Sequence, residues 1–116
     1  MKNKKNKKRF WEVYVPYHSN DGVKFELAYH RLWDEKVRVI AGGLTIFKIS
    51  KGQWVKGNEI YFDKMIPVRI HCTKKDIKKI VDITMIHYNQ LAVFYFKVSN
   101  YARVVKRKDN GIQETK

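Results

Sequence analysis

The first patterned stretch of the chain, residues 10–17, alternates two kinds of side chain in strict succession. Trp11, Val13 and Val15 fall on one side of an extended chain, whereas Glu12 and Tyr14 fall on the other. A period of two is typical of a strand with one buried face. The sequence therefore predicts a first strand here, and the polar residues 18–22 predict the turn that follows it.

The next stretch, residues 23–40, changes to helical spacing. Apolar side chains, among them Phe25, Leu32 and Ile40, recur every three or four residues, and charged side chains occupy most other positions. This pattern predicts an amphipathic helix. Gly42 and Gly43 follow it, and glycine readily takes the left-handed conformation that ends a helix.

Two extended stretches come next, with turn-forming residues between them. Residues 44–50 and 59–72 are rich in strand-forming side chains, and residues 51–58 contain two glycines. This order predicts a long hairpin with a bulge or bend near residues 63–67, where the pattern is interrupted.

The last part of the chain predicts a second helix and a final strand. Thr73 precedes Asp76 by three positions, which is typical of a helix N-cap, and apolar side chains then recur at helical spacing up to Tyr88. Residues 91–98 alternate again and predict a strand, which residues 101–105 could extend past a bulge.

The order strand, helix, strand, strand, helix, strand predicts an α+β protein with a ferredoxin-like fold. Right-handed crossovers would give a β-α-β-β-α-β sandwich: a four-stranded antiparallel sheet with both helices on one face. The first and third strands would lie in the middle of the sheet. The alternative is another small α+β sheet in which the long hairpin stands away from the body.

The composition fits one domain, because 116 residues with 44% hydrophobic side chains can build one core but not two. We expect the domain to span residues 10–105, between a basic arm over residues 1–9 and a basic polar tail over residues 106–116. The single cysteine, Cys72, cannot form an internal disulfide, and no apolar run approaches the roughly 20 residues of a membrane span. These features predict a cytoplasmic protein without a membrane partner.

The net charge changes the functional picture, because 25 basic residues face only 11 acidic ones and leave +14. Such a surplus favours an anionic partner, of which nucleic acid or another polyanion is the usual kind. The arm alone offers Lys4, Lys5, Lys7, Lys8 and Arg9 to such a partner.

The sheet face turned away from the helices offers further candidates. If Trp11 and Val13 face the helices together with Phe94 and Phe96, the neighbours of these residues face outward. Rings interleaved with cations can stack bases and neutralise phosphates. The predicted outward set is Tyr14, Arg69, His71, Tyr95 and Lys97.

Other uses of the same residues stay open. An open sheet face is commonly covered by a second subunit, so we also expect a homodimer. The lysines of the second helix could follow a phosphate backbone near a helix N-terminus, or could simply form a solvated helix face. These lysines are Lys74, Lys75, Lys78 and Lys79.

No catalytic constellation stands out in the sequence. The four histidines lack the spacing of metal ligands, so we expect neither a metal nor a cofactor. His18 is the best single candidate for a general base. Glu26, His30 and Asp34 share one helix face, where they could hold a divalent ion or form an ordinary surface cluster.

Several short motifs carry a resemblance to known sequences. They are Gly42-Gly43-Leu44-Thr45, Gly52 with Trp54, Tyr61, Asp63, and Val68-Arg69-Ile70. Over residues 11–98 the chain resembles small uncharacterised ferredoxin-like proteins of bacteria, archaea and phages. The resemblance implies the ferredoxin-like fold and no activity.

Together these patterns predict a small basic binding module that engages nucleic acid or another polyanion through its sheet face and arm. One alternative is a homodimeric protein-interaction factor, such as a phage or mobile-element inhibitor of a host protein. Another is a small nuclease or nucleotide-acting enzyme.

Overall fold

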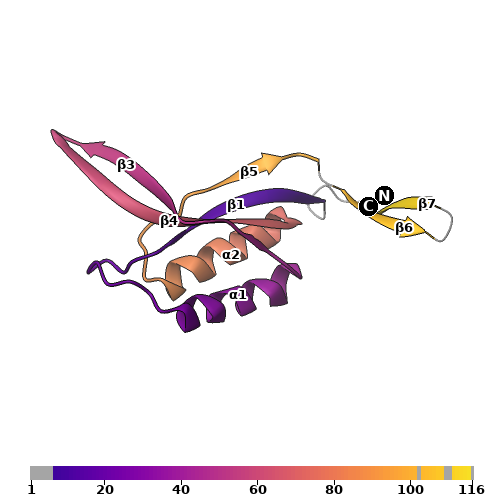
Figure 1. Cartoon of the computed structure of the whole chain (residues 1–116), viewed down its shortest axis with the longest axis horizontal. Helices are drawn as coiled ribbons and strands as arrows, with labels where there is room; N and C mark the ends of the chain where they lie inside the picture. The colour runs from indigo at the N-terminus through magenta and orange to yellow at the C-terminus, as the bar shows by residue number, and fades with distance from the viewer. Residues whose placement is uncertain (1–6, 102, 109–110, 116) are drawn as a thin grey trace.

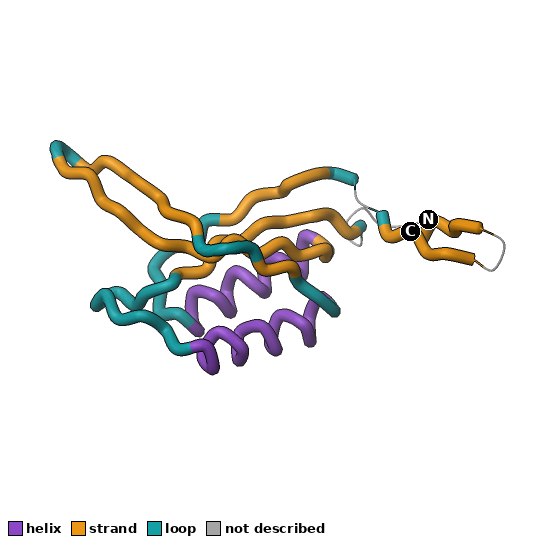
Figure 2. The backbone as a smooth tube through the Cα atoms, in the orientation of Figure 1, coloured by secondary structure: helices purple, strands orange, loops and turns teal. Residues whose placement is uncertain are grey.

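Two helices lie side by side on one face of an antiparallel sheet in the computed structural model, which describes residues 7–101, 103–108 and 111–115 (Figure 1, Figure 2). The α+β class predicted from the sequence is therefore confirmed. The elements are β1 (Lys8–Pro16), α1 (Leu27–Ala41), β2 (Thr45–Ile46), β3 (Ser50–Lys56), β4 (Glu59–Thr73), α2 (Lys74–His87), β5 (Tyr95–Ser99), β6 (Val104–Lys108) and β7 (Gly111–Thr115).

The strands of the main sheet have the order β2-β4-β1-β5, and β3 also pairs with β4. β1 and β4 occupy the middle, as predicted for the first and third strands. β4 is long enough to pair with β1 and β2 near its end and with β3 near its start. The β3-β4 hairpin consequently projects from the body, which is the feature of the alternative arrangement that the sequence left open (Figure 1).

The second predicted strand is much shorter than expected. Of residues 44–50, only Thr45 and Ile46 form β2, because the chain leaves the edge of β4 after Phe47 donates a backbone hydrogen bond to Pro67. The chain then returns to β4 as β3, further along the same strand. The strand-forming residues 44–50 therefore contribute to two strands, β2 and the start of β3.

The helix ends follow the local sequence signals. Gly42 has a φ of 86°, and its N–H donates to the Arg38 carbonyl, so the left-handed glycine ends α1 as predicted. The hydroxyl of Thr73 accepts a hydrogen bond from the Asp76 N–H at 3.1 Å and caps α2. α1 begins four residues later than expected, because the Phe25 N–H donates to the Tyr17 carbonyl and Glu26, the N-cap, is extended.

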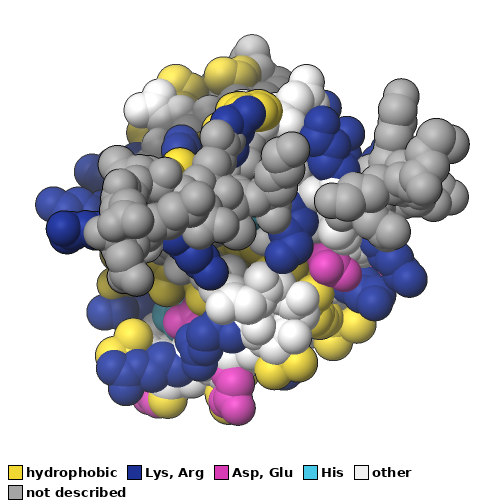
Figure 3. Space-filling model, turned by 90° about the vertical axis from the view of Figure 1, so that its right-hand side faces the viewer, with side chains coloured by type: hydrophobic (Ala, Val, Ile, Leu, Met, Phe, Trp, Pro, Cys, Tyr) yellow, Lys and Arg dark blue, Asp and Glu magenta, His cyan; other side chains and the backbone are white. Residues whose placement is uncertain are grey.

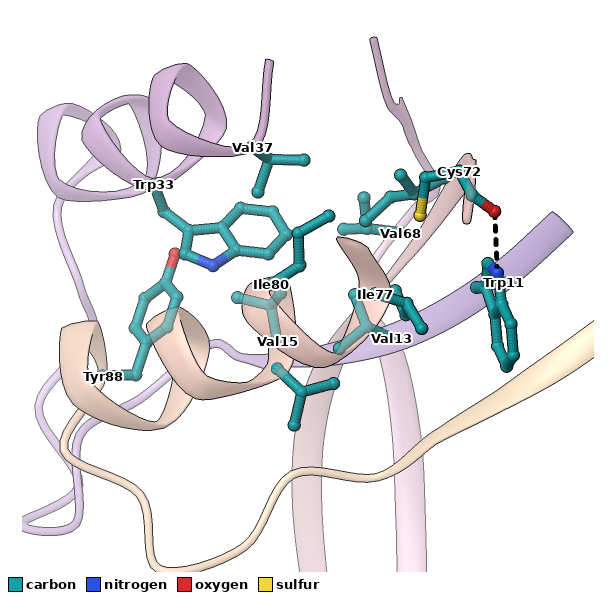
Figure 4. Close-up of a cluster of buried hydrophobic side chains, with 12 residues drawn as sticks. Trp11, Val13, Val15, Trp33, Val37, Val68, Cys72, Ile77, Ile80 and Tyr88 are labelled. Carbon is teal, nitrogen blue, oxygen red and sulfur yellow. Dashed lines mark hydrogen bonds between the residues drawn. The ribbon is translucent and has the colours of Figure 1, made fainter. Parts of the chain in front are cut away.

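The core fills the space between the sheet and the helices (Figure 4). Trp11, Val13 and Val15 are buried as the alternation predicted. Indole N–H groups are satisfied inside the core, since Trp11 donates to the Cys72 carbonyl at 3.0 Å and Trp33 donates to the Thr84 hydroxyl at 2.9 Å. The further buried apolar residues are Val37, Val68, Ile70, Cys72, Ile77, Ile80, Val81 and Tyr88.

The ends of the chain differ from the predicted arm and tail. Lys8 and Arg9 belong to β1 rather than to an arm, and Lys7 is exposed just before it. Lys4 and Lys5 lie outside the described residues. Most of the predicted tail contributes to a separate β6-β7 hairpin, at the end of the molecule away from the β3-β4 hairpin (Figure 1).

Within the described ranges, no helix combines the length and the apolar character needed to cross a membrane.

Candidate functional site

The pairing of β5 with β1 determines which side chains face away from the helices. Val13 lies opposite Tyr95 and Glu12 lies opposite Phe96. Paired residues project on the same side of a sheet, so Tyr95 lies on the helix side together with Val13. The centres of the Tyr95 and Trp11 rings are 6.2 Å apart. The prediction that Tyr95 and Lys97 face outward is wrong, because β5 is turned over relative to the predicted orientation.

Phenylalanines occupy the outward positions of this strand instead. The Phe94 ring lies 5.4 Å from that of Tyr14 and 5.8 Å from that of Phe96. Across the sheet, the Phe10 ring contacts His71 at 5.5 Å. We call this surface the open face, and it consists of Phe10, Glu12, Tyr14, Arg69, His71, Phe94 and Phe96.

The centre of the open face carries an ion pair. Nε of Arg69 lies 2.8 Å from Oε1 of Glu12, and the Glu12 side chain is almost completely buried. The Arg69 guanidinium also lies over the Phe47 ring, 4.9 Å from its centre. Burial and the Glu12 carboxylate raise the pKa of Tyr14, so its hydroxyl group keeps its proton at physiological pH. Arg69, one of the cations that the sequence analysis assigned to phosphate binding, is therefore already paired with a carboxylate.

The lysines of α2 form a solvated face. All four are exposed: Lys74, Lys75, Lys78 and Lys79. The helix N-terminus beside them is capped by Thr73 and has Asp76 in its first turn, and both features offset its partial positive charge. Part of the positive charge at this helix end is therefore already offset within the chain, and phosphate contact by the four lysines stays a prediction.

The candidate catalytic residues are dispersed. Cys72 is buried, and burial followed by the nearby Asp76 raises the pKa of its thiol to about 12, which removes it as a nucleophile. His71 lies on the open face and so does not approach that thiol. His18 packs edge-on against Tyr17, with 4.9 Å between the ring centres.

A polar cluster joins the C-terminal end of α2 to the start of α1, and we call it the helix junction. Nδ1 of His30 lies 2.7 Å from the Tyr88 hydroxyl. Nε2 of His87 lies 2.8 Å from the Tyr29 carbonyl, and the Tyr29 hydroxyl donates to the His87 carbonyl. Lys36 approaches Nδ1 of His87 at 3.4 Å. Sequence reasoning missed this cluster, although adjacent aromatic and histidine residues on both helices, 29–30 and 87–88, were a signal for it.

The predicted helix-face cluster does not form a metal site. His30 turns to Tyr88, whereas Asp34 is half-buried and burial raises the pKa of its carboxyl group. Among residues 7–101, 103–108 and 111–115, no three His, Cys, Asp or Glu side chains lie close enough together to hold a metal ion.

Comparison with known proteins identifies similar folds. No protein-family model matches the sequence, and no curated protein matches it. The divalent cation tolerance protein CutA1 of Thermus thermophilus matches 79% of this chain and 82% of its own, at 10% identity and a TM-score of 0.60. CutA1 of Shewanella sp. SIB1 matches 84% of this chain and 85% of its own, at 11% identity and a TM-score of 0.63.

Another similar structure is a phage SAM lyase in complex with S-methyl-5'-thioadenosine. It matches 88% of this chain and 98% of its own, at 8% identity and a TM-score of 0.55. Identities this low establish a shared fold and leave activity undetermined.

These findings correct the functional prediction made from the sequence. The similar structures include several divalent cation tolerance proteins, which are not nucleic-acid-binding modules, and this finding contradicts the predicted module that engages nucleic acid or another polyanion. The open face gives the physical reason, because Phe94, just before β5, and Phe96, within β5, lie there in place of Tyr95 and Lys97. Arg69 is paired with Glu12, so the surface is apolar with a compensated centre.

Proposed function

We propose that this protein is a self-associating interaction protein whose smallest functional form is a homodimer. The observation that carries the proposal is the open face, a sheet surface covered with aromatic side chains that no other part of the described chain covers. The proposal includes a ferredoxin-like core, to which the β3-β4 hairpin is added, and a cytoplasmic location. It also includes membership of the small ferredoxin-like group that the sequence motifs resemble.

Exposed aromatic area is the first argument. Phe94 is 61% exposed and Phe96 is 37% exposed, and Phe47, which lies under the Arg69 guanidinium toward the opposite edge of the sheet, is 40% exposed. Apolar side chains that adjoin one another lose favourable burial when they remain in water, and such patches mark interaction surfaces. The helices already cover the other face of the sheet (Figure 1), so the open face is the one that a partner can cover.

The charge arrangement is the second argument, and it favours a second copy as the partner. Burying an unpaired charge in an interface is costly, but Glu12 and Arg69 already neutralise each other within one chain. A two-fold interface brings the same patch of both copies together. The phenylalanine rings of one copy would then pack on those of the other. The Glu12–Arg69 pairs of the two copies would meet near the symmetry axis, where the carboxylate of one copy could lie beside the guanidinium of the other.

The β3-β4 hairpin provides a further surface for interaction. A two-stranded hairpin is marginally stable alone, and this one exposes apolar side chains at positions along both strands. They are Trp54, Val55, Ile60, Tyr61 and Phe62. Because the hairpin projects from the body, contact with these residues would enlarge the area that association removes from water.

Analytical ultracentrifugation of the full chain tests the proposal. We expect the parent protein to sediment above the 13.9 kDa monomer and to dissociate on dilution. The double variant F94E/F96E places two carboxylates on the open face, and we expect it to associate at least about tenfold more weakly. Both positions are exposed in the monomer, so the variant should keep the circular dichroism spectrum of the parent.

The matched control is V39E/L91E, which adds the same charge at two exposed apolar positions outside the open face. We expect it to associate like the parent. A parent protein that is monomeric throughout, or equal weakening by both double variants, would refute self-association through the open face.

A further inference from the structure

A cleft lies at the start of α1, away from the open face. Its volume is about 540 Å³, and it opens between the turn before α1 and the end of β1. Aromatic and aliphatic side chains form most of its wall, namely Tyr17, Phe25, Leu27 and Ile66. Lys24, Glu26 and His30 complete the lining.

His30 is the unusual residue in this wall. Its Nε2 atom is buried and has no hydrogen-bond partner in the part of the chain that the structure describes. A buried polar atom without a partner costs free energy, so it calls for a physical explanation. Such an atom beside an apolar cleft is typical of a binding site in which a few polar groups orient a ligand.

The hydrogen-bond network of the helix junction defines what Nε2 can do. The Tyr88 hydroxyl is deeply buried, and burial raises its pKa, so it keeps its proton. Its hydrogen-bond partner in the described chain is Nδ1 of His30, at 2.7 Å. If Tyr88 donates to Nδ1, the neutral ring carries its proton on Nε2. His30 then offers an N–H donor that lacks an acceptor.

Two opposite charges, Lys24 and Glu26, line the cleft beside this donor, and no ion pair joins them in the described part of the chain. Lys24 is exposed at the cleft, with its ammonium 5.2 Å from the centre of the Tyr17 ring. In the described part of the chain, the ion pair that forms is Glu12 with Arg69, so the Lys24 ammonium has no carboxylate partner. A carboxylate accepts hydrogen bonds and attracts a cation at once, which makes it the group that suits both residues.

We infer that this cleft binds a small carboxylic acid with an apolar ring, whose carboxylate accepts a hydrogen bond from Nε2 of His30 and pairs with Lys24. The ring lies among Tyr17, Phe25 and Leu27. Tyr88 is a positioning residue, because it holds the tautomer that makes His30 a donor. This site is separate from the open face and goes beyond the proposed self-association.

Benzoate is the probe, and NMR correlation of imidazole protons with ring nitrogens is the measurement. We expect benzoate to shift the His30 ring signals saturably, with a dissociation constant on the order of 1 mM for so small a ligand. Benzyl alcohol has the same ring without the charge, and we expect it to bind about tenfold more weakly.

Two substitutions separate binding from folding. K24M keeps the aliphatic stem and removes the charge, so benzoate should bind about tenfold more weakly, whereas K48M at an exposed position outside the cleft should change nothing. H30L lacks the His30 signals, so its binding is followed by the NMR line widths of benzoate itself, and we expect H30L to abolish binding. If H30L loses its native circular dichroism spectrum, K24M decides alone.

The inference is wrong if benzoate leaves the His30 signals unchanged, or if K24M and benzyl alcohol behave like the parent protein with benzoate. F94E/F96E should bind benzoate like the parent, so failure of the cleft and failure of the open face are separate results.

Discussion

His30 shows how burial changes the chemistry of one residue. Its pKa is lowered from the ordinary value of 6.5, first by burial, then by His87 and then by Lys24. The unfolded chain therefore takes up this proton at a higher pH than the folded chain does. The contribution of a neutral His30 is complete above the ordinary pKa and is lost as the pH falls below it.

We therefore predict that the free energy of unfolding decreases between about pH 7 and about pH 5, and that H30Q reduces this slope. The measurement is urea unfolding at several pH values. The neighbours in the junction are His87, Lys36, Lys24 and Tyr88, and all of them remain in H30Q. H18Q, a histidine outside the junction, should keep the full slope. An unchanged slope in H30Q would place the pH dependence elsewhere.

At the scale of the elements, the end of α1 depends on a single backbone conformation. Gly42 has a φ of 86°, which a residue with a Cβ adopts at a cost, whereas Gly43 has an ordinary φ. A Cβ added at either glycine meets no atom within 4 Å. The two positions therefore differ in backbone strain rather than in available space.

We predict that G42A lowers the free energy of unfolding by about 1 kcal/mol, while G43A leaves it unchanged or raises it by about 0.5 kcal/mol. Chemical denaturation of both variants measures the difference. Equal effects of the two substitutions would show that the left-handed conformation is not what ends the helix.

The elements also show how far the sequence alone could lead. Local signals were sufficient for β1, α2 and the Gly42 end of α1, because alternation, capping and left-handed glycine act within a few residues. The orientation of β5 was predicted wrongly because both of its faces carry large apolar side chains. Phe94 and Phe96 are the more hydrophobic pair and were assigned to the core, but Tyr95 packs there against Trp11.

The candidate sites were harder to predict than the strands. The open face depends on the register between β1 and β5, and the helix junction joins residues 58 positions apart, such as His30 and Tyr88. Neither arrangement is set by local spacing. Adjoining exposed phenylalanines are typical of interaction surfaces, so the wrong assignment of Phe94 and Phe96 to the core falls on the surface proposed for self-association.

At the scale of the whole molecule, the net charge of +14 opposes the association of two copies. Lys and Arg side chains lie on several sides of the end shown in Figure 3, with few acidic side chains between them. Repulsion between such surfaces acts over distance, whereas the apolar contact of two open faces acts only where they touch. Salt screens the charge repulsion and leaves the apolar contact unchanged.

We therefore predict that self-association strengthens as sodium chloride is raised from low to physiological concentration. Sedimentation at a series of salt concentrations measures this trend, with the more weakly associating variant F94E/F96E as the reference for non-ideal behaviour. Association that weakens steeply with salt would indicate an ionic interface in place of the open face.

The central position of β4 also has a consequence for the newly made chain. β1 finds its partner in residues 65–73, so Lys8 pairs with Thr73 across most of the domain. During synthesis, the apolar side of β1 leaves the ribosome long before any strand can pair with it. Closing so large a loop is slow, and the sheet can form only after β4 has emerged. The risk of aggregation is therefore greatest in the half-made chain, and Trp11 is the largest apolar side chain of β1 that waits for the core.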